Sequence, residues 1–174
     1  MMCSYNAETT GEGIFGKGTQ GGAIPSCANK GLMNDLARDK WGFNGYITSD
    51  CGAVTGVQNS HKYTTNAKDT VTAVLTAGMD TDCGGFMGNK TLLPLLADRK
   101  ILALIDTALT HLFMVQFRLG FADPPAMVPF SKLGPEVVNT PEHQVLAKYC
   151  ELQHKCQLFV GFSIENAEIM WNCP

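Results

Sequence analysis

The order of predicted elements along this chain is typical of an α/β protein with a parallel sheet. Short runs rich in β-branched and aromatic residues alternate with helical patterns, and a carboxylate directly follows two of these runs. The chain has 174 residues, of which 45% are hydrophobic and 17% are charged. These fractions are those of a globular protein, and the length corresponds to one domain or to a piece of a larger one.

The first strand and helix are predicted before residue 43. Met2–Tyr5 is a candidate strand tip, and the Gly- and Thr-rich stretch 6–22 is predicted to be an exposed loop because it has no core-forming pattern. Asn29 is a plausible N-cap for a helix that ends near Trp41. The apolar face of that helix consists of Leu32, Met33, Leu36 and Ala37.

Two more strands are predicted on either side of a helix. Gly45–Ser49 is typical of a buried strand, and Met79–Asp82 is a brief second one. Between them, residues 66–77 have helical periodicity, and Gly78 fits the C-cap of that helix. The chain therefore contains successive βα units.

The second half of the chain is predicted to be mainly helical. Residues 90–97 form a short helix interrupted by Pro94, and 101–119 is the strongest helical pattern. Residues 122–139 are Pro-rich and are expected to be extended. A helix follows from Thr140 to about residue 153, and residues 157–162 are a candidate strand.

The positions of two acids carry the functional information. Asp50 directly follows one predicted strand and Asp82 ends the next. Active sites of parallel α/β proteins lie at the carboxyl ends of the strands, where a carboxylate is held rigidly and faces a cavity. The alternative is that Asp50 merely caps the next turn, and spacing alone does not favour either interpretation.

Charge and composition exclude several classes of partner. With 13 Lys and Arg against 16 Asp and Glu, the chain has no electrostatic reason to bind nucleic acid or an anionic membrane. We expect no apolar run of the roughly 20 residues that span a bilayer, and no signal peptide at the start. Neither a cofactor nor a metal is predicted, because no Cys-x-x-Cys pair is present and Cys150 with His154 lacks a third ligand.

Several motifs between residues 2 and 153 occur in the order typical of one known family. They are Met2–Asn6, Pro25–Asn29, Trp41–Cys51, Ala77–Gly85, Ile105–Leu109, Phe117–Phe121 and Val138–His143. In their types and order they resemble glycoside hydrolase family 3, and most closely its β-xylosidase branch.

The resemblance implies a (β/α)8 TIM-type barrel followed by an α/β sandwich domain. A complete barrel needs about 250 residues, so this chain would supply only about the last three βα units. Residues 1–121 are then the C-terminal part of the barrel, and 122–139 are the linker toward a missing sandwich domain. Residues 140–174 would be a helix and the start of a truncated or divergent second domain. The chain is thus expected to be a fragment or a truncated product.

The resemblance also implies a reaction. A retaining exo-acting β-glycosidase hydrolyses terminal β-linked sugars through a covalent glycosyl-enzyme, and the Ser-Asp motif assigns the nucleophile to Asp50. The general acid of this family usually comes from the second domain, so no residue of this chain is assigned that role. The expected substrate is a β-linked oligosaccharide or xylo-oligosaccharide, and the expected location is extracellular or the cell wall.

The resemblance assigns substrate contacts to Tyr5, Cys51, His61 and Tyr63. Tyr5 matches an active-site tyrosine, and Cys51 belongs to the nucleophile motif. His61 and Tyr63 would line the substrate entrance, although a solvated loop is an equally good interpretation for both. His111 and Arg118 are expected on a helix surface rather than in the site.

Four cysteines are disulfide candidates. Cys51 and Cys83 end neighbouring strands, so we expect their Cα atoms to lie within the roughly 4.4–6.8 Å that a disulfide requires. Cys3 with Cys27 would similarly fasten the Gly-rich loop. Buried free thiols are the alternative, and the largely secreted branch favours disulfides.

Two functional alternatives remain open. The chain is either part of an active glycosidase or a catalytically inactive product that at most binds a sugar or a partner. Within the family, β-glucosidase or N-acetylglucosaminidase specificity is the alternative to β-xylosidase. Two departures from the family pattern, a longer stretch at 8–21 and the loss of resemblance after Gln153, support the interpretation as an altered fragment.

Overall fold

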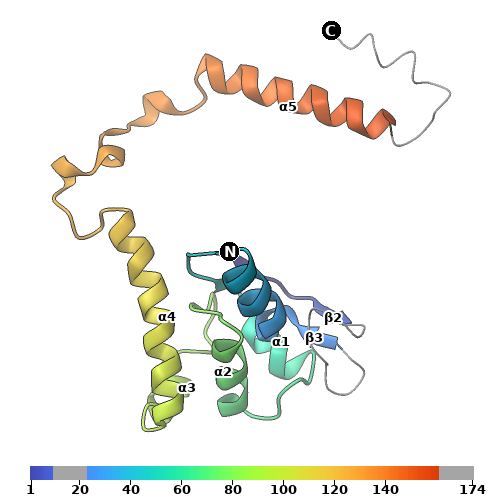
Figure 1. Cartoon of the computed structure of the whole chain (residues 1–174), viewed down its shortest axis with the longest axis vertical. Coiled ribbons are helices and arrows are strands. Elements are labelled where there is room, and N and C mark those ends of the chain that lie inside the picture. Colours follow the sequence, from blue (N-terminus) through green and yellow to red (C-terminus); the bar gives the residue numbers. More distant parts are fainter. Residues whose placement is uncertain (10–22, 161–174) are drawn as a thin grey trace. The chain divides into compact units, whose positions relative to one another are not determined.

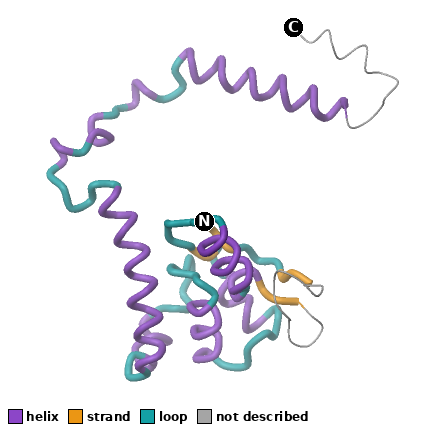
Figure 2. Tube along the Cα trace, viewed as in Figure 1, coloured by secondary structure: helices purple, strands orange, loops and turns teal. Residues whose placement is uncertain are grey.

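The computed structural model describes residues 1–9 and 23–160. The chain divides into two compact units, Met1–Ala122 and Asp123–Pro174, and each is described by itself (Figure 1). The described strands are short, and helices make up most of both units (Figure 2).

A small parallel sheet organises the first unit. Strand β1 (Met2–Cys3) pairs in parallel with β4 (Thr48–Ser49), and a parallel bridge joins Thr48 to Thr81 on the next segment. The Ser49 N–H donates to the Thr81 carbonyl at 2.9 Å. Parallel pairing is thus confirmed for these residues, while the predicted strand 79–82 is reduced to a single bridge.

A two-stranded ladder occupies part of the predicted loop. Strand β2 (Ala7–Thr9) pairs antiparallel with β3 (Ala23–Pro25), so the prediction of a loop was wrong for residues 7–9. Residues 10–22 lie outside the described residues. The 3-10 turn η1 (Ser26–Ala28) follows β3 and is buried.

The helix η2 (Gly31–Lys40) occupies the predicted position. The Asn29 side-chain oxygen accepts the Leu32 N–H at 3.1 Å, which satisfies one of the free donors at the helix start. The helix is of the π type over its whole length, and the bond from the Trp41 N–H to the Leu36 carbonyl, five residues back, continues this pattern at its end.

Helices α1 (Ala53–Asn59) and α2 (Ala67–Thr76) follow β4. The sequence did not predict α1, because it has only seven residues, with a glycine among them. Helix α2 is confirmed, with Asn66 as its N-cap, and Gly78 has a φ of +100°, which an L-residue rarely adopts. The core packed between these helices and the sheet includes the fully buried side chains of Met33, Ile47, Val54, Val57, Val74 and Met79.

The long helix α4 (Arg99–Arg118) packs on α2 and follows the short α3 (Asn89–Leu92) and η3 (Leu93–Leu95). On its apolar face, Ile101 and Ala108 are buried. Leu109 and Phe113 of the same face are 41% and 46% exposed. Within the described residues, α4 is therefore covered over only part of its apolar face.

Helix α4 also departs from one expectation. It is long and apolar enough to cross a membrane by length and composition, whereas the sequence analysis expected no such run. Length and composition alone are weak evidence of a membrane span, because core helices have the same properties. Ile101 of α4 packs with Val71 and Leu75 in one apolar cluster. Packing within the first unit therefore explains part of the apolar composition of α4.

The second unit begins with three 3-10 turns, η4 (Pro125–Met127), η5 (Pro129–Lys132) and η6 (Pro135–Val137), in place of the predicted extended linker. Helix α5 (Pro141–Val160) follows and continues past the predicted end near residue 153. Residues 157–160 of the candidate strand are therefore helical, and the remainder lies outside the described residues.

A buried carboxylate ties the elements of the first unit together. The Asp80 side chain is only 2% exposed. Its Oδ2 accepts bonds from Arg38 Nη2 at 2.6 Å and from the Ile47 N–H at 2.7 Å, and its Oδ1 lies 2.7 Å from His111 Nδ1. Asp80 thus links η2, the approach to β4 and α4. Arg38 also donates to the carbonyls of Gly45 and Gly78.

These contacts correct the expectation for His111, whereas Arg118 lies on the helix surface as expected. The His111 side chain is 24% exposed and bonded to Asp80, so it is a structural link rather than a surface residue. Arg118 is exposed, but its Nη1 donates to the Asn44 carbonyl at 2.7 Å. Both side chains connect α4 to the segment around β4.

We predict that Asp80→Asn lowers the free energy of unfolding by about 3 to 5 kcal/mol, because it leaves the buried Arg38 guanidinium without its counter-charge. Denaturant unfolding followed by circular dichroism measures this loss. Asp35→Asn is the matched control: its Lys30–Asp35 ion pair is half exposed and should change the free energy by at most about 1 kcal/mol. Equal losses in the two variants would contradict a special role for Asp80.

Candidate active site

Asp50 lies at the carboxyl end of β4, where a sharp turn leads into α1. Its backbone N–H donates to the Cys3 carbonyl at 2.8 Å, which continues the pairing with β1. Two residues later, Gly52 adopts a φ of +87°, and helix α1 begins at Ala53. The strand thus fixes the backbone of Asp50 while the turn leaves its side chain at the rim.

The Asp50 carboxylate is only lightly engaged. Its Oδ1 accepts the neighbouring Cys51 N–H at 2.7 Å, and the residue is half-buried. Among the described residues, no ion pair involves Asp50. This bond is the kind that the capping alternative expects, but the cap position of α1 is Gly52. The side chain is therefore held in a turn at the rim and carries no counter-charge among the described residues.

Tyr5 lies against the same turn. Its hydroxyl donates to the Cys51 carbonyl at 2.6 Å, while the residue remains 55% exposed. The pKa of Tyr5 is raised above its ordinary value of 10.0. The largest cause is loss of solvent around the phenol, and the hydrogen bond to Asp50 and the negative charge of Asp50 raise it further. Tyr5 is thus a neutral hydrogen-bond donor beside a carboxylate.

His61 joins this group, but Tyr63 does not. His61 Nε2 donates to the Tyr5 carbonyl at 2.8 Å, and the turn that follows gives Lys62 a φ of +52°. Tyr63 instead packs on the hydrophobic core that includes Val57. The structure therefore brings together Asp50, Tyr5, Cys51 and His61, and separates Tyr63 from them.

Two disulfides flank the turn. Cys51–Cys83 joins the residue after Asp50 to the residue after Asp82, and Cys3–Cys27 joins β1 to η1. These are the two pairs named as candidates from the sequence. The Gly52 N–H also donates to the Cys83 carbonyl at 2.7 Å. The carboxyl ends of the two segments are thus cross-linked at the rim.

Asp82 has a different environment from Asp50. Its Oδ1 accepts from the Ser49 hydroxyl at 3.2 Å and its Oδ2 accepts from the Met87 N–H at 2.9 Å. Ser49 is fully buried, and its hydroxyl oxygen also accepts the Cys83 N–H. Both oxygens of Asp82 thus hold the loop after Thr81. The role of Ser49 was missed from the sequence, although a buried hydroxyl inside a strand indicates a polar partner.

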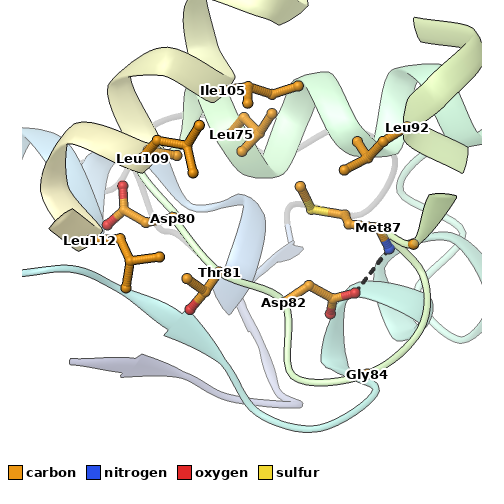
Figure 3. Close-up of a pocket in the computed structure, with 12 residues that line it drawn as sticks. Leu75, Asp80, Thr81, Asp82, Gly84, Met87, Leu92, Ile105, Leu109 and Leu112 are labelled. Atoms are coloured by element: carbon orange, nitrogen blue, oxygen red, sulfur yellow. Dashed lines mark hydrogen bonds between the residues drawn. The ribbon is translucent and has the colours of Figure 1, made fainter. Parts of the chain in front are cut away.

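An apolar hollow lies beside the segment of Asp82 and does not include Asp50 (Figure 3). Leu75 of α2 and the α4 residues Ile105, Leu109 and Leu112 line one side of it. Met87 and Leu92 lie opposite, and the Met87 N–H bonds to Asp82. Its lining is mainly aliphatic, which is typical of a packing surface rather than of a polar sugar site.

The described residues contain no group of three or more metal-ligating side chains. Cys150 is an exposed free thiol, and the side chain of His154 lies outside the described residues.

Comparison with known proteins identifies relatives over most of the chain. The profile of the glycosyl hydrolase family 3 N terminal domain matches residues 8–83. The chain is 38% identical to probable beta-D-xylosidase 7 of Arabidopsis thaliana over 148 residues, 84% of this chain and 18% of that protein. It is 33% identical to the exo-1,4-beta-xylosidase bxlB of Emericella nidulans over 160 residues, 88% of this chain and 19% of that protein.

Solved structures give the same family. A GH3 exo-beta-xylosidase in complex with a xylobiose aziridine activity-based probe is 30% identical, with a TM-score of 0.53 over 63% of this chain and 14% of that one. A beta-glucosidase from Listeria innocua in complex with glucose is 27% identical, with a TM-score of 0.58 over 74% of this chain and 18% of that one.

The parallel strands, the acid at the strand end and these relatives place the chain among the glycoside hydrolases. It belongs to glycoside hydrolase family 3, and within that family it is β-xylosidase-like. The chain spans less than a fifth of the length of these curated relatives.

We predict that Asp50→Asn lowers the pKa of Tyr5 toward 10.0, because it removes the negative charge and the carboxylate acceptor. The pKa should stay above 10.0, since loss of solvent is the largest cause and is unchanged. NMR titration of the tyrosine ring carbons, with Tyr5 assigned from a Tyr5→Phe variant, measures it. Asp39→Asn, an exposed acid on η2, should leave the value unchanged. A Tyr5 pKa that does not move in Asp50→Asn would mean that the two side chains do not interact in solution.

Proposed function

We propose that this chain is part of a retaining, exo-acting β-glycosidase with β-xylosidase-like specificity, in which Asp50 is the nucleophile. The observation that carries the proposal is the location of Asp50 at the carboxyl end of a parallel strand, beside the Tyr5 hydroxyl and without an ion pair among the described residues. Family membership supports the reaction class, and the relatives named β-xylosidases support the sugar.

The proposed chemistry follows from the environment of Asp50. An ionised Asp50 attacks the anomeric carbon of a terminal β-linked sugar, the glycosidic C–O bond breaks, and the sugar is held on the carboxylate as an ester. Water then attacks the same carbon and releases the sugar with retained configuration. Tyr5 supports the step by donating near the carboxylate and limiting the freedom of the turn at Cys51.

We assign substrate contacts to Tyr5, Cys51 and His61 on the same basis. A chain of hydrogen bonds of 2.6 to 2.8 Å joins them to Asp50: His61 bonds to Tyr5, Tyr5 to Cys51, and Cys51 to the Asp50 carboxylate. Tyr63 remains only a weak proposal, because its ring packs on the core. The second carboxyl, which a retaining glycosidase needs about 5 to 5.5 Å from the nucleophile, is proposed to come from outside this chain.

The fold proposal is that residues 1–121 are the last three βα units of a (β/α)8 barrel. Residues 122–139 would then link the barrel to a second domain whose start includes residues 140–174. The exposed apolar residues Leu109 and Phe113 on α4 support a chain that lacks part of its packing partners. A β-linked xylo-oligosaccharide is the proposed substrate, and an extracellular or cell-wall location is proposed from the family.

The first test is a chimaeric enzyme in which this chain replaces the matching 148 residues of probable beta-D-xylosidase 7. We expect hydrolysis of an aryl β-xyloside, and a loss of about a thousandfold or more in kcat/KM for Asp50→Ala, because no covalent intermediate can form. Added azide should restore turnover in that variant and give the α-glycosyl azide. Asp39→Ala is the control. Normal activity of Asp50→Ala would reject the assignment.

A second candidate function is that the 174-residue chain is catalytically inactive by itself and at most binds a sugar. The exposed apolar face of α4 and the lack of an assigned general acid favour it for the isolated chain. We expect no measurable hydrolysis of an aryl β-xyloside or β-glucoside by this chain, because leaving-group protonation lacks its donor. Clear turnover that disappears in Asp50→Ala would reject this candidate. The ratio of β-xyloside to β-glucoside hydrolysis in the chimaeric enzyme tests the sugar preference.

A further inference from the structure

The sequence contains one Asn-x-Ser/Thr motif, which begins at Asn89. No proline lies within the motif or directly after it. The motif is Asn89-Lys90-Thr91. Such a sequence is the acceptor for N-linked glycans when it lies on the surface of a protein that enters the secretory pathway. We propose that Asn89 is an N-glycosylation site of this protein.

The structure supports the motif by exposure. Asn89 and Lys90 are exposed, and Thr91 is half-buried. Gly88 precedes them as the cap of α3, and its carbonyl accepts the Thr91 N–H at 2.9 Å. Among the described residues, none forms a hydrogen bond with the Asn89 side-chain amide. The amide nitrogen is therefore accessible and is not required by the fold.

Three other asparagines of the chain have side chains that form hydrogen bonds within the fold. Asn29 is fully buried, and its side chain bonds to Leu32 and Glu8. The Asn66 side chain caps α2, and Asn34 Nδ2 donates to the Thr76 carbonyl at 3.0 Å. Within residues 1–9 and 23–160, the Asn89 side chain has no such hydrogen bond, so a glycan attached there would not break one.

The two disulfides are an independent observation that points to the same compartment. Cys3–Cys27 and Cys51–Cys83 close loops with sequence separations of 24 and 32 residues. Disulfides persist in oxidising compartments, and in eukaryotic cells those compartments include the endoplasmic reticulum, where N-glycans are attached. A chain that forms these disulfides there also meets the glycosylation machinery.

Attachment of the oligosaccharide to Asn89 is a substitution at carbon and needs no oxidant. The Asn89 amide nitrogen attacks C1 of the reducing-end sugar of a lipid pyrophosphate-linked oligosaccharide, an N–C bond forms and the C1–O bond to pyrophosphate breaks. The amide loses one proton, and the lipid pyrophosphate leaves. The attached glycan would lie next to Leu93, which is 62% exposed and bonds through its N–H to the Asn89 carbonyl. It would therefore shield an apolar side chain from contact with other chains.

The test is expression of the full 174-residue chain behind a cleavable secretion leader in yeast, with intact-mass measurement before and after peptide N-glycosidase. We expect one enzyme-removable glycan, with aspartate left at position 89 after removal. Asn89→Gln and Thr91→Ala should lose the glycan. Thr91→Ser should keep it, as should Asn59→Gln, which alters an exposed asparagine outside the motif.

If the chain is poorly secreted, cell-free translation of the same chain with microsomes gives the same test, because the glycan is attached inside the microsomes and export is not required. A wild-type chain that enters the microsomes without a glycan, or is secreted without one, overturns the proposal. Asp50→Asn should carry the same glycan as the wild type, so this proposal and the assignment of the nucleophile fail separately.

Discussion

The buried carboxylate of Asp80 is the interaction on which the rest of the first unit depends. It receives a guanidinium from η2, a backbone N–H from the approach to β4 and an imidazole from α4. A carboxylate that is removed from water needs such partners, because an unpaired buried charge is strongly destabilising. The three partners come from distant parts of the sequence, so one side chain sets where η2 and α4 lie relative to the sheet.

Three aspartates near the sheet illustrate how environment decides a role. Asp80 is buried and paired with charged groups, and Asp82 uses both oxygens to hold the loop through Ser49 and Met87. Asp50 accepts one local N–H and remains half-buried at the rim. Of the three, Asp50 is the one at the rim that lacks a charged partner among the described residues, which fits its proposed role as the nucleophile.

The rim is held by a different kind of constraint from the interior. The Cys51–Cys83 disulfide and the Gly52–Cys83 hydrogen bond join the turn at Asp50 to the loop after Asp82. The interior of the unit has apolar packing and the Asp80 contacts, but α4 still exposes a large part of its apolar face. Apolar surface of this extent is typical of a region that packs on further chain.

Local patterns were enough to predict η2, α2 and α4, because their apolar periodicity and caps such as Asn66 act within a few residues. Motif resemblance identified the family and named Asp50 and the four paired cysteines. The sequence could not predict the Asp80 contacts, the pairing of Ala7–Thr9 with Ala23–Pro25 or the packing of Tyr63 on the core. Those features depend on which distant segments meet in space, and neither periodicity nor spacing encodes that meeting. Only the tertiary structure decided them.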